Sequence, residues 1–222
     1  MNYRDICVLD FETGSVNPHS TQPIQVAAVM IHGRKLKIQP NGYFESLIRP
    51  ILDDDEAIAS GIDPIEDEAL AINKKTREEL KTAPRPKMVW ENFIQFVNKF
   101  NYKKSTWTAP IVSGYNIENF DMVIVNRLCN EYGPLSKRGG QGLVNPIHRI
   151  DVMHDVFMWT ENDPDVKSIS MDSVRNWMGM DKTNAHDALQ DVKDTADILI
   201  HFLKLYRHLS TKVQFAKSFQ ND

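Results

Sequence analysis

Two carboxylates stand at the end of an apolar run near the start of the sequence. Residues Ile6 to Leu9 have the composition of a buried β-strand, and Asp10 and Glu12 follow one residue apart. Side chains two apart on a strand point the same way, so both carboxylates should project together beside an apolar wall. Two like charges held this close repel each other. A divalent cation would offset that repulsion, so the pair predicts a metal site if other segments supply further oxygen ligands.

A second candidate ligand lies where a predicted strand leads into a helix. The segment SGYNIENFDMVIV places Asp121 in the first turn of a helix predicted over residues 119–133. A carboxylate there is favoured by the helix dipole, so a capping role alone can explain it. Asp121 is therefore a ligand candidate only in combination with the others.

The third candidate belongs to the last predicted helix, residues 187–209, which carries four aspartates. Helical periodicity places Asp191 at the edge of the apolar face, half-buried near a sheet. The other three are predicted to lie on the solvated far side: Asp187, Asp194 and Asp197. His186 comes just before this helix, where its side chain can turn into a cleft. Each feature has a plain explanation alone, but three separated carboxylate sites with one histidine predict a catalytic metal centre.

These residues need a sheet that brings strand ends and helix starts together. Three apolar or alternating segments come first and predict an antiparallel meander: residues 5–11, 23–33 and 41–50, the last after an Asn-Gly turn. Shorter strands at 109–116 and 148–151 then alternate with amphipathic helices. The pattern predicts an α/β fold with a mixed central sheet flanked by helices. Ligands in such sheets sit at the carboxyl ends of strands, which is where Asp10 and Glu12 lie.

The chain length and composition fit one compact domain. The 222 residues are 41% hydrophobic, and we expect one domain over 1–210 with a polar tail over 211–222. No segment resembles a membrane span or a signal peptide. Cys7 and Cys129 fall in apolar patterns and are expected to be buried thiols, so a cytoplasmic location follows.

The net charge of −4 argues against a tight, non-specific duplex binder with a large basic face. It does not exclude a phosphodiester substrate, because bound divalent cations can supply the positive field.

Three motifs resemble those of a known nuclease superfamily. The segments DFET with Asp10 and Glu12, GYNIENFD with Asp121, and HDALQD with His186 and Asp191 resemble the exonuclease motifs of the DnaQ-like DEDD superfamily, in its DEDDh subclass. They occur in order across nearly the whole chain, and their forms look closest to the nuclease domain of the bacterial exonuclease I family. The resemblance implies a ribonuclease H-like fold and metal-dependent 3′→5′ removal of nucleoside 5′-monophosphates, with single-stranded DNA as the favoured substrate.

The resemblance also implies roles for individual residues. Two divalent ions, Mg²⁺ or Mn²⁺, would be held by the four carboxylates, and the histidine would act as general base. Thr13 and Ile62 match positions at the terminal nucleotide, and Asn116 would line the path of the strand. Asp63 stands where the family commonly has threonine.

Other residues could touch a nucleic acid strand. Trp90 and Trp177 fall in helical patterns and are expected in the core, whereas Trp107, in the polar segment KKSTWT, could stack on a base. Lys137 and Arg138 lie in a glycine-rich loop that is either phosphate-binding or a plain surface loop.

Two alternative functions stay open. A 3′→5′ exoribonuclease or oligonucleotide trimmer would share all five catalytic positions. A proofreading or binding module beside a polymerase is also possible, although an inactive module would be expected to have lost one of the five residues, and none is missing. Nothing in the sequence indicates a membrane or a protein partner.

Overall fold

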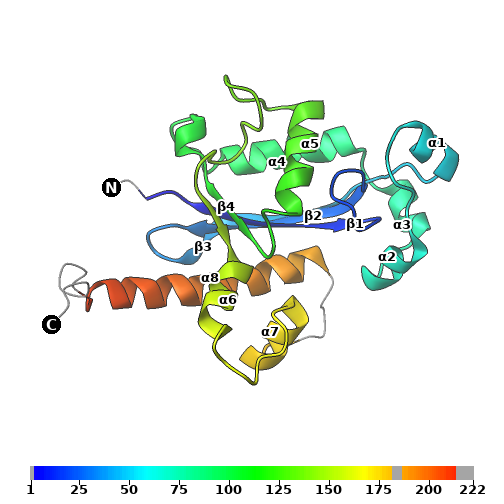
Figure 1. Cartoon of the computed structure of the whole chain (residues 1–222). Coiled ribbons are helices and arrows are strands. Elements are labelled where there is room, and N and C mark those ends of the chain that lie inside the picture. Colours follow the sequence, from blue (N-terminus) through cyan, green and yellow to red (C-terminus); the bar gives the residue numbers. More distant parts are fainter. Residues whose placement is uncertain (1–2, 182–186, 214–222) are drawn as a thin grey trace.

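A five-stranded mixed sheet lies at the centre of the molecule, between two layers of helices, in the computed structural model (Figure 1). The structure describes residues 3–181 and 187–213. The strands follow the order β3-β2-β1-β4-β5 across the sheet. Their bounds are β1 Ile6–Thr13, β2 Pro23–His32, β3 Lys37–Leu47, β4 Ile111–Gly114 and β5 Arg149–Asp151.

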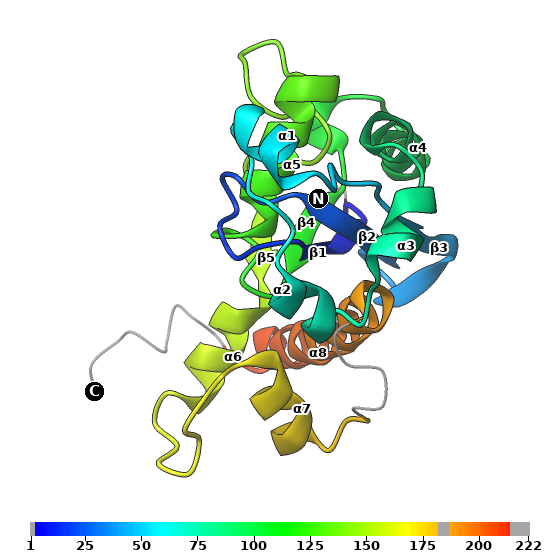
Figure 2. The same ribbon diagram turned by 90° about the vertical axis from the view of Figure 1, so that its right-hand side faces the viewer.

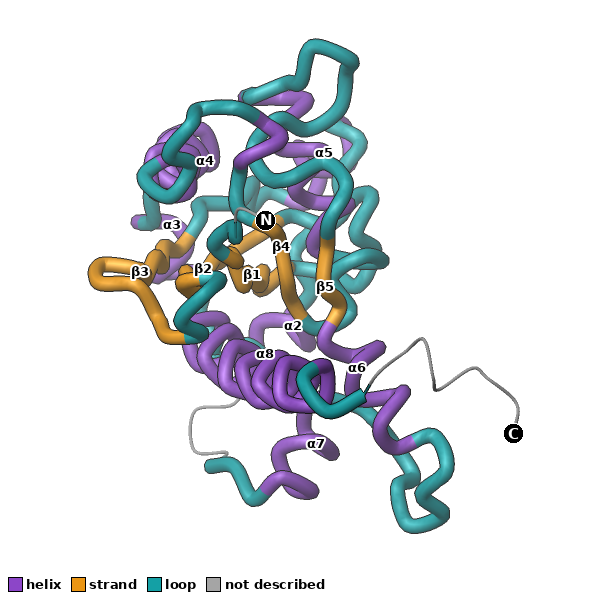
Figure 3. The backbone as a smooth tube through the Cα atoms, turned by 90° about the vertical axis from the view of Figure 1, so that its left-hand side faces the viewer, coloured by secondary structure: helices purple, strands orange, loops and turns teal. Residues whose placement is uncertain are grey.

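The first three strands are antiparallel neighbours, and the last two run parallel to β1. This confirms the predicted mixed sheet with an antiparallel meander followed by parallel strands. Figure 3 shows β3 at one edge of the sheet and β5 at the other, with α4 and α5 above and α8 below.

The start of the third strand differs from the prediction. The chain turns at residues 33–36, and Asn41 and Gly42 lie inside β3 rather than in a turn before it. The pairing of β2 with β3 shifts register between Val29 and Ile31, and Asn41 adopts a φ of 55°. The Asn-Gly pair therefore serves a β-bulge, a role that uses the same backbone freedom as a turn.

Alternate residues of β1 serve the two hydrophobic layers. Cys7, Leu9 and Phe11 point to the layer with α4 (Pro86–Asn98) and α5 (Asp121–Tyr132). Ile6 and Val8 point to the layer with α8. The helices on this second side are α6 Val152–Thr160, α7 Met171–Met178 and α8 Ala188–Ser210. Burial on both faces explains why β1 is an apolar run rather than an alternating one.

Three short helices surround the carboxyl end of β1, on the side that faces the viewer in Figure 2. They are α1 Asp54–Ala59, α2 Asp67–Ile72 and α3 Arg77–Thr82. Ile65, Leu70 and Leu80 pack with Ile24 of β2 into a small separate cluster. This cluster fixes the acidic and helical segment against the end of the sheet where the predicted site lies.

Burial confirms some of the side-chain predictions. Cys7 and Cys129 are buried thiols, and Trp90 is only 2% exposed. The prediction for Trp177 is wrong, because its side chain is 45% exposed on α7. Helix α7 is short and covers only part of α8, so one face of it stays in solvent. None of the described helices is both long and apolar enough to cross a membrane.

Candidate active site

The carboxylates of β1 project toward the α8 side of the sheet. Asp10 and Glu12 continue the series of Ile6 and Val8, whose side chains pack in the α8 layer. Glu12 is 9% exposed, and Asp10 is half-buried. The period of two along the strand thus places both carboxylates on one face, as predicted.

The first turn of α8 brings a third carboxylate to this pair. Asp191 lies in the first turn of this helix, which begins at Ala188. One carboxylate oxygen from each of Asp10, Glu12 and Asp191 lies within 4.8 Å of the other two. Residues separated by about 180 positions in the chain therefore meet in a single cluster, which we call the carboxylate cluster.

Asp121 reaches the same region from the other layer. Strand β4 ends at Gly114, while β1 continues to Thr13, so the backbone of β1 beyond this point lacks a neighbour on the β4 side. The N–H of Phe11 instead donates to Oδ1 of Asp121 at 3.0 Å. Asp121 is the first residue of α5 and is 2% exposed. This hydrogen bond satisfies a buried donor and fixes the helix start against β1.

The cluster carries more negative charge than its surroundings balance. Burial raises the pKa of Asp10 well above its ordinary value, and the charges of Asp121, Glu12 and Asp191 raise it further. Burial and Asp191 raise the pKa of Glu12 to about 7. Burial raises the pKa of Asp121 to about 8, although the Phe11 N–H partly opposes this. Such shifts mark groups placed for a purpose other than stability.

A buried arginine supports the cluster from α7. Arg175 is fully buried, and its Nη2 donates to Oδ1 of Asp191 at 2.6 Å. Its Nε donates to Oδ2 of Asp194 at 2.7 Å, and its Nη1 pairs with Asp172 at 3.3 Å. The prediction that Asp194 is solvated is therefore wrong, because α7 covers that side of α8. Sequence reasoning missed Arg175, since only the packing of α7 on α8 reveals its partners.

Asp187 is also more enclosed than predicted. Its Oδ1 accepts from Gln25 Nε2 at 3.1 Å and pairs with Lys75 Nζ at 3.5 Å. The positive charge of Lys75 lowers the pKa of Glu12 and so opposes part of the rise. Asp197 is exposed, as predicted.

Two further residues, His186 and Thr13, were predicted to act with these carboxylates, and the structure describes only Thr13. His186 lies outside the described residues. Thr13 is buried, and its hydroxyl donates to the carbonyl of Ser15 at 2.8 Å. Its own carbonyl accepts from Asn73 Nδ2 at 3.0 Å. Thr13 is therefore held rigidly at the end of β1, with a hydroxyl oxygen that can still accept a hydrogen bond.

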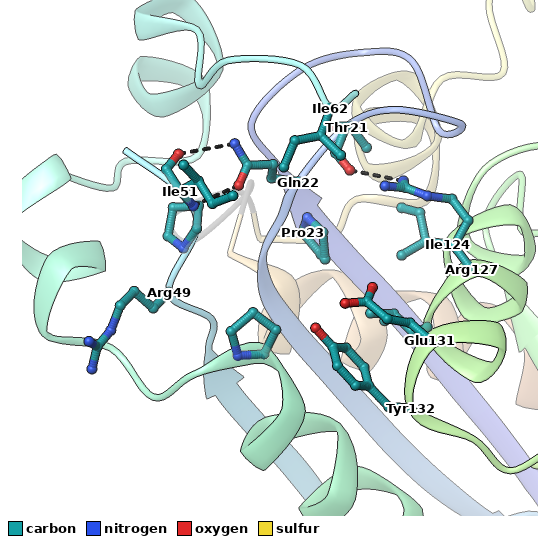
Figure 4. Close-up of a pocket in the computed structure, with 13 residues that line it drawn as sticks. Thr21, Gln22, Pro23, Arg49, Ile51, Ile62, Ile124, Arg127, Glu131 and Tyr132 are labelled. Atoms are coloured by element: carbon teal, nitrogen blue, oxygen red, sulfur yellow. Dashed lines mark hydrogen bonds between the residues drawn. The ribbon is translucent and has the colours of Figure 1, made fainter. Parts of the chain in front are cut away.

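Ile62 lines a separate cavity of about 350 Å³ between α5 and the segments before β2 and after β3 (Figure 4). Ile124, one turn along α5 from Asp121, lines the same cavity. Figure 4 also shows Arg127 bonded to the carbonyl of Thr21. None of the four carboxylates is among the described residues that line this cavity.

Asp63 occupies the position after Ile62 for a structural reason. Its Oδ2 accepts from the hydroxyls of Ser15 at 2.7 Å and Ser20 at 2.9 Å. The carboxylate therefore joins this segment to the loop that follows β1. A hydroxyl at this position would be an uncharged acceptor, so its hydrogen bonds with the two serines would be weaker than those of the carboxylate.

Asn116 is placed by a carboxylate at the end of β5. Its backbone N–H donates to Oδ1 of Asp151 at 2.9 Å, and its φ is 57°. Its side-chain Oδ1 accepts from Asn119 Nδ2 at 3.1 Å. The charge of Asp151 also raises the pKa of Asp121, so Asn116 lies on the side of the site formed by β4, β5 and α5.

The donor set fits a hard divalent cation. The carboxylate cluster supplies only oxygen ligands, and Mg²⁺ and Mn²⁺ prefer such ligands. Burial, followed by the charges of neighbouring carboxylates, raises the pKa values of Asp10, Glu12 and Asp121, so a bound cation would favour their charged forms. Arg175 and Lys75 offset only part of this rise.

Comparison with known proteins agrees with this chemistry. Residues 7–199 match the RNase_T family model, which is described as an exonuclease. No curated protein sequence matches the chain.

Solved structures share the fold at low identity. E. coli exonuclease I in complex with a dT13 oligonucleotide matches with a TM-score of 0.68 and 19% identity, over 94% of this chain and 44% of that one. Cell-death related nuclease 4 matches with a TM-score of 0.66 and 17% identity, over 91% and 64%. The ribonuclease H-like exonuclease fold is thus confirmed, and the chain spans less than half the length of the exonuclease I chain.

Proposed function

The chain belongs to the RNase_T exonuclease family, and we propose that it removes nucleoside 5′-monophosphates from the 3′ end of single-stranded nucleic acid, with DNA favoured over RNA. The observation that carries this proposal is the meeting of Asp10, Glu12 and Asp191 within 4.8 Å, with Asp121 fixed beside them by the Phe11 N–H. A structural role does not explain why a protein would bury repelling carboxylates at the end of its central strand.

We assign the four carboxylates as ligands of two divalent ions, Mg²⁺ or Mn²⁺. When bound, such a pair of ions lowers the pKa of the attacking water and stabilises the charge that develops on the phosphate and the leaving oxygen. The residues of this chain hold the ligand carboxylates in place. Nη2 of Arg175 donates to one oxygen of Asp191, and the Phe11 N–H donates to one oxygen of Asp121, so both carboxylates are held in place at the site.

His186 is proposed as the general base. It precedes Asp191 by five residues, and the ordinary pKa of histidine, about 6.5, suits a base near neutral pH. The expected result of His186→Ala is loss of most turnover with metal binding retained. Isothermal titration with Mn²⁺ beside a turnover assay checks both halves, and cleavage at the wild-type rate would assign the base elsewhere.

Thr13, Ile62 and Asn116 are proposed to position the terminal nucleotides. Thr13 stands at the end of β1 next to the carboxylate cluster, and Ile62 lines the cavity along α5. Asn116 follows β4, and its backbone N–H donates to Asp151. These three would therefore surround a 3′-terminal nucleotide whose phosphate lies at the carboxylates.

The preference for DNA rests on likeness alone. Among the solved structures of similar fold is E. coli exonuclease I with a bound dT13 oligonucleotide. A 3′→5′ exoribonuclease remains the second candidate, because the carboxylates and the histidine do not distinguish a 2′-hydroxyl from a hydrogen.

A gel assay on 5′-labelled single-stranded DNA, RNA and blunt duplex DNA tests the proposal, with Mg²⁺, Mn²⁺ or EDTA. We expect a metal-dependent ladder that shortens from the 3′ end of DNA. Asp191→Asn should abolish the ladder, whereas Asp197→Asn, an exposed carboxylate on the same helix, should leave it unchanged. Faster loss of RNA than DNA would favour the second candidate, and an inert, folded, metal-binding protein would overturn the proposal.

A further inference from the structure

Two chain segments that are far apart in the sequence form one groove on the α5 side of the sheet. Residues 104–107 lie before β4, and residues 135–141 follow α5. Together with residues 146–149 they line a groove of about 980 Å³, which we call the basic groove. Figure 1 shows the loop after α5 at the top of the molecule, on the same side of the sheet as α4 and α5.

The basic groove has a charge opposite to that of the protein as a whole. Its cationic side chains are Lys104, Lys137 and Arg138, together with Arg149, whose charge is balanced by Glu118 at 2.6 Å. No aspartate or glutamate is among the described residues that line it, although the chain carries a net charge of −4. Such a local concentration of positive charge attracts a polyanion.

A tight turn presents two of these cations. The N–H of Gly139 donates to the carbonyl of Ser136 at 3.1 Å, and the N–H of Ser136 donates to the carbonyl of Gly140 at 2.9 Å. Lys137 and Arg138 are the central residues of this turn and are exposed. Gly139 and Gly140 have φ values of 81° and 73°, which favour glycine. The backbone is therefore ordered before any ligand binds.

An exposed indole lies in the same groove. Trp107 is in the short 3₁₀-helix Thr106–Thr108, which Ser105 caps. Its carbonyl accepts from Asn145 Nδ2 at 3.0 Å, yet its side chain is 50% exposed. A rigid backbone with a free ring is the arrangement that stacks on a base at low entropic cost.

Two elements connect the basic groove with the carboxylate site. Asn126 lines the groove and lies five residues after Asp121 on α5, a rise of about 7.5 Å along the helix. Arg149 lines it at the start of β5, two residues before Asp151. Arg149 also pairs at 2.6 Å with Glu118, in the loop that carries Asn116.

We propose that the basic groove binds the single strand upstream of its 3′ end, with phosphates at Lys137 and Arg138 and a base on Trp107. The inference rests on the proposed function, because it assumes that the 3′ end lies at the carboxylates. It adds a second contact region several nucleotides away from the reaction. Long strands therefore bind more tightly than short ones, which end before they reach the groove.

Binding measurements test the proposed role of the basic groove without cleavage of the strand. Fluorescence anisotropy of 5′-labelled single-stranded oligonucleotides of about 3 and about 15 nucleotides is measured with full-length Asp191→Asn protein. We expect Lys137→Ala/Arg138→Ala to weaken binding of the long strand and to reduce the slope of log K against log salt by about 1.4, since each phosphate contact contributes about 0.7. Trp107→Ala should weaken it by about tenfold or more, the effect of losing one stacked base.

The short strand and a matched variant serve as controls. Lys35→Ala/Lys204→Ala removes two exposed lysines outside the groove and should change neither strand. Equal affinity of the two strands, or equal losses with groove and control variants, would overturn the inference.

A cleavage assay in the wild-type background separates this from failure of the proposed function. Groove variants should raise KM for the long strand and leave cleavage of the short one unchanged. An inert wild type that still binds the long strand through the groove would overturn only the proposed function.

Discussion

At the scale of single residues, Arg175 shows how much of the site depends on one side chain. It is fully buried and pairs with Asp191, Asp194 and Asp172. Buried ion pairs are costly to break, because the remaining charge loses its partner in a poorly solvated place. The arginine thus links the position of a proposed metal ligand to the stability of α7 on α8.

Arg175→Met is expected to destabilise the protein by about 3–5 kcal/mol, the usual cost of removing one partner of a buried pair. Urea unfolding measures this. The double variant Arg175→Met/Asp194→Leu should recover part of the stability, because it removes the arginine together with Asp194, the most buried of its three partners. Turnover should stay low, because the bond to Asp191 is lost. A single variant as stable as the wild type would contradict the prediction.

The raised pKa values predict an unusual pH dependence for the metal-free protein. Glu12 has an ordinary pKa of 4.5 and one of about 7 when folded. Between these values the native state holds a proton that the unfolded state has released, so the free energy of unfolding falls as pH rises. The loss begins above pH 4.5, levels off above pH 7 for Glu12, and amounts to roughly 3 kcal/mol for this group alone.

Urea unfolding in EDTA at about pH 5, 6, 7 and 8 tests this expectation. Glu12→Gln should flatten part of the dependence because the amide does not titrate. Asp197→Asn, an exposed control, should keep the wild-type slope. A stability that rises over this range would show that the cluster is not the dominant titrating group.

At the scale of elements, the close approach of β4 to β1 decides where Asp121 can lie. A Cβ added at Gly114 would be 2.5 Å from Ile117 Cδ1 and 2.9 Å from the carbonyl oxygen of Leu9. Both distances are shorter than packed atoms allow. Glycine therefore lets β4 end directly beside β1, just before the loop that leads to α5.

Gly114→Ala is expected to cost about 1–3 kcal/mol through overpacking and to lower turnover by shifting α5. Thermal unfolding and the cleavage assay together measure the effect. Gly114→Ala/Ile117→Val relieves the side-chain contact but not the contact with Leu9, so stability should recover only in part. Wild-type stability of the single variant would contradict this.

The elements also show what a sequence can and cannot predict here. Period-two and period-3.6 patterns predicted the mixed sheet, a helix with Asp121 in its first turn and the shared face of Asp10 and Glu12. The same helical projection placed Asp194 in solvent and missed its arginine. A projection assigns faces relative to one apolar stripe, whereas α8 is covered by the sheet on one side and by α7 on another.

At the scale of the whole molecule, the site gathers carboxylates whose mutual repulsion is offset either by protons or by bound cations. We therefore expect Mg²⁺ or Mn²⁺ to raise the melting temperature. Metal at about 100 times its Kd adds ~2.7 kcal/mol, which is roughly 5–10 °C for a chain of this size.

Differential scanning fluorimetry with each chloride salt, matched in ionic strength by KCl, measures the shift. Asp10→Asn should melt higher than the wild type in EDTA, because one repelling charge is gone, and should show little response to metal. A flat response of the wild type across millimolar metal would count against the metal site.

The order of the ligands along the chain has a consequence for biosynthesis. Asp10 and Glu12 leave the ribosome before Asp121, and Asp191 follows only with α8. Because α8 must emerge and pack on β1 and β2 before the carboxylates meet, a growing chain carries an incomplete site until α8 has been synthesised. A chain that stops before α8 therefore lacks Asp191 and cannot complete the carboxylate cluster.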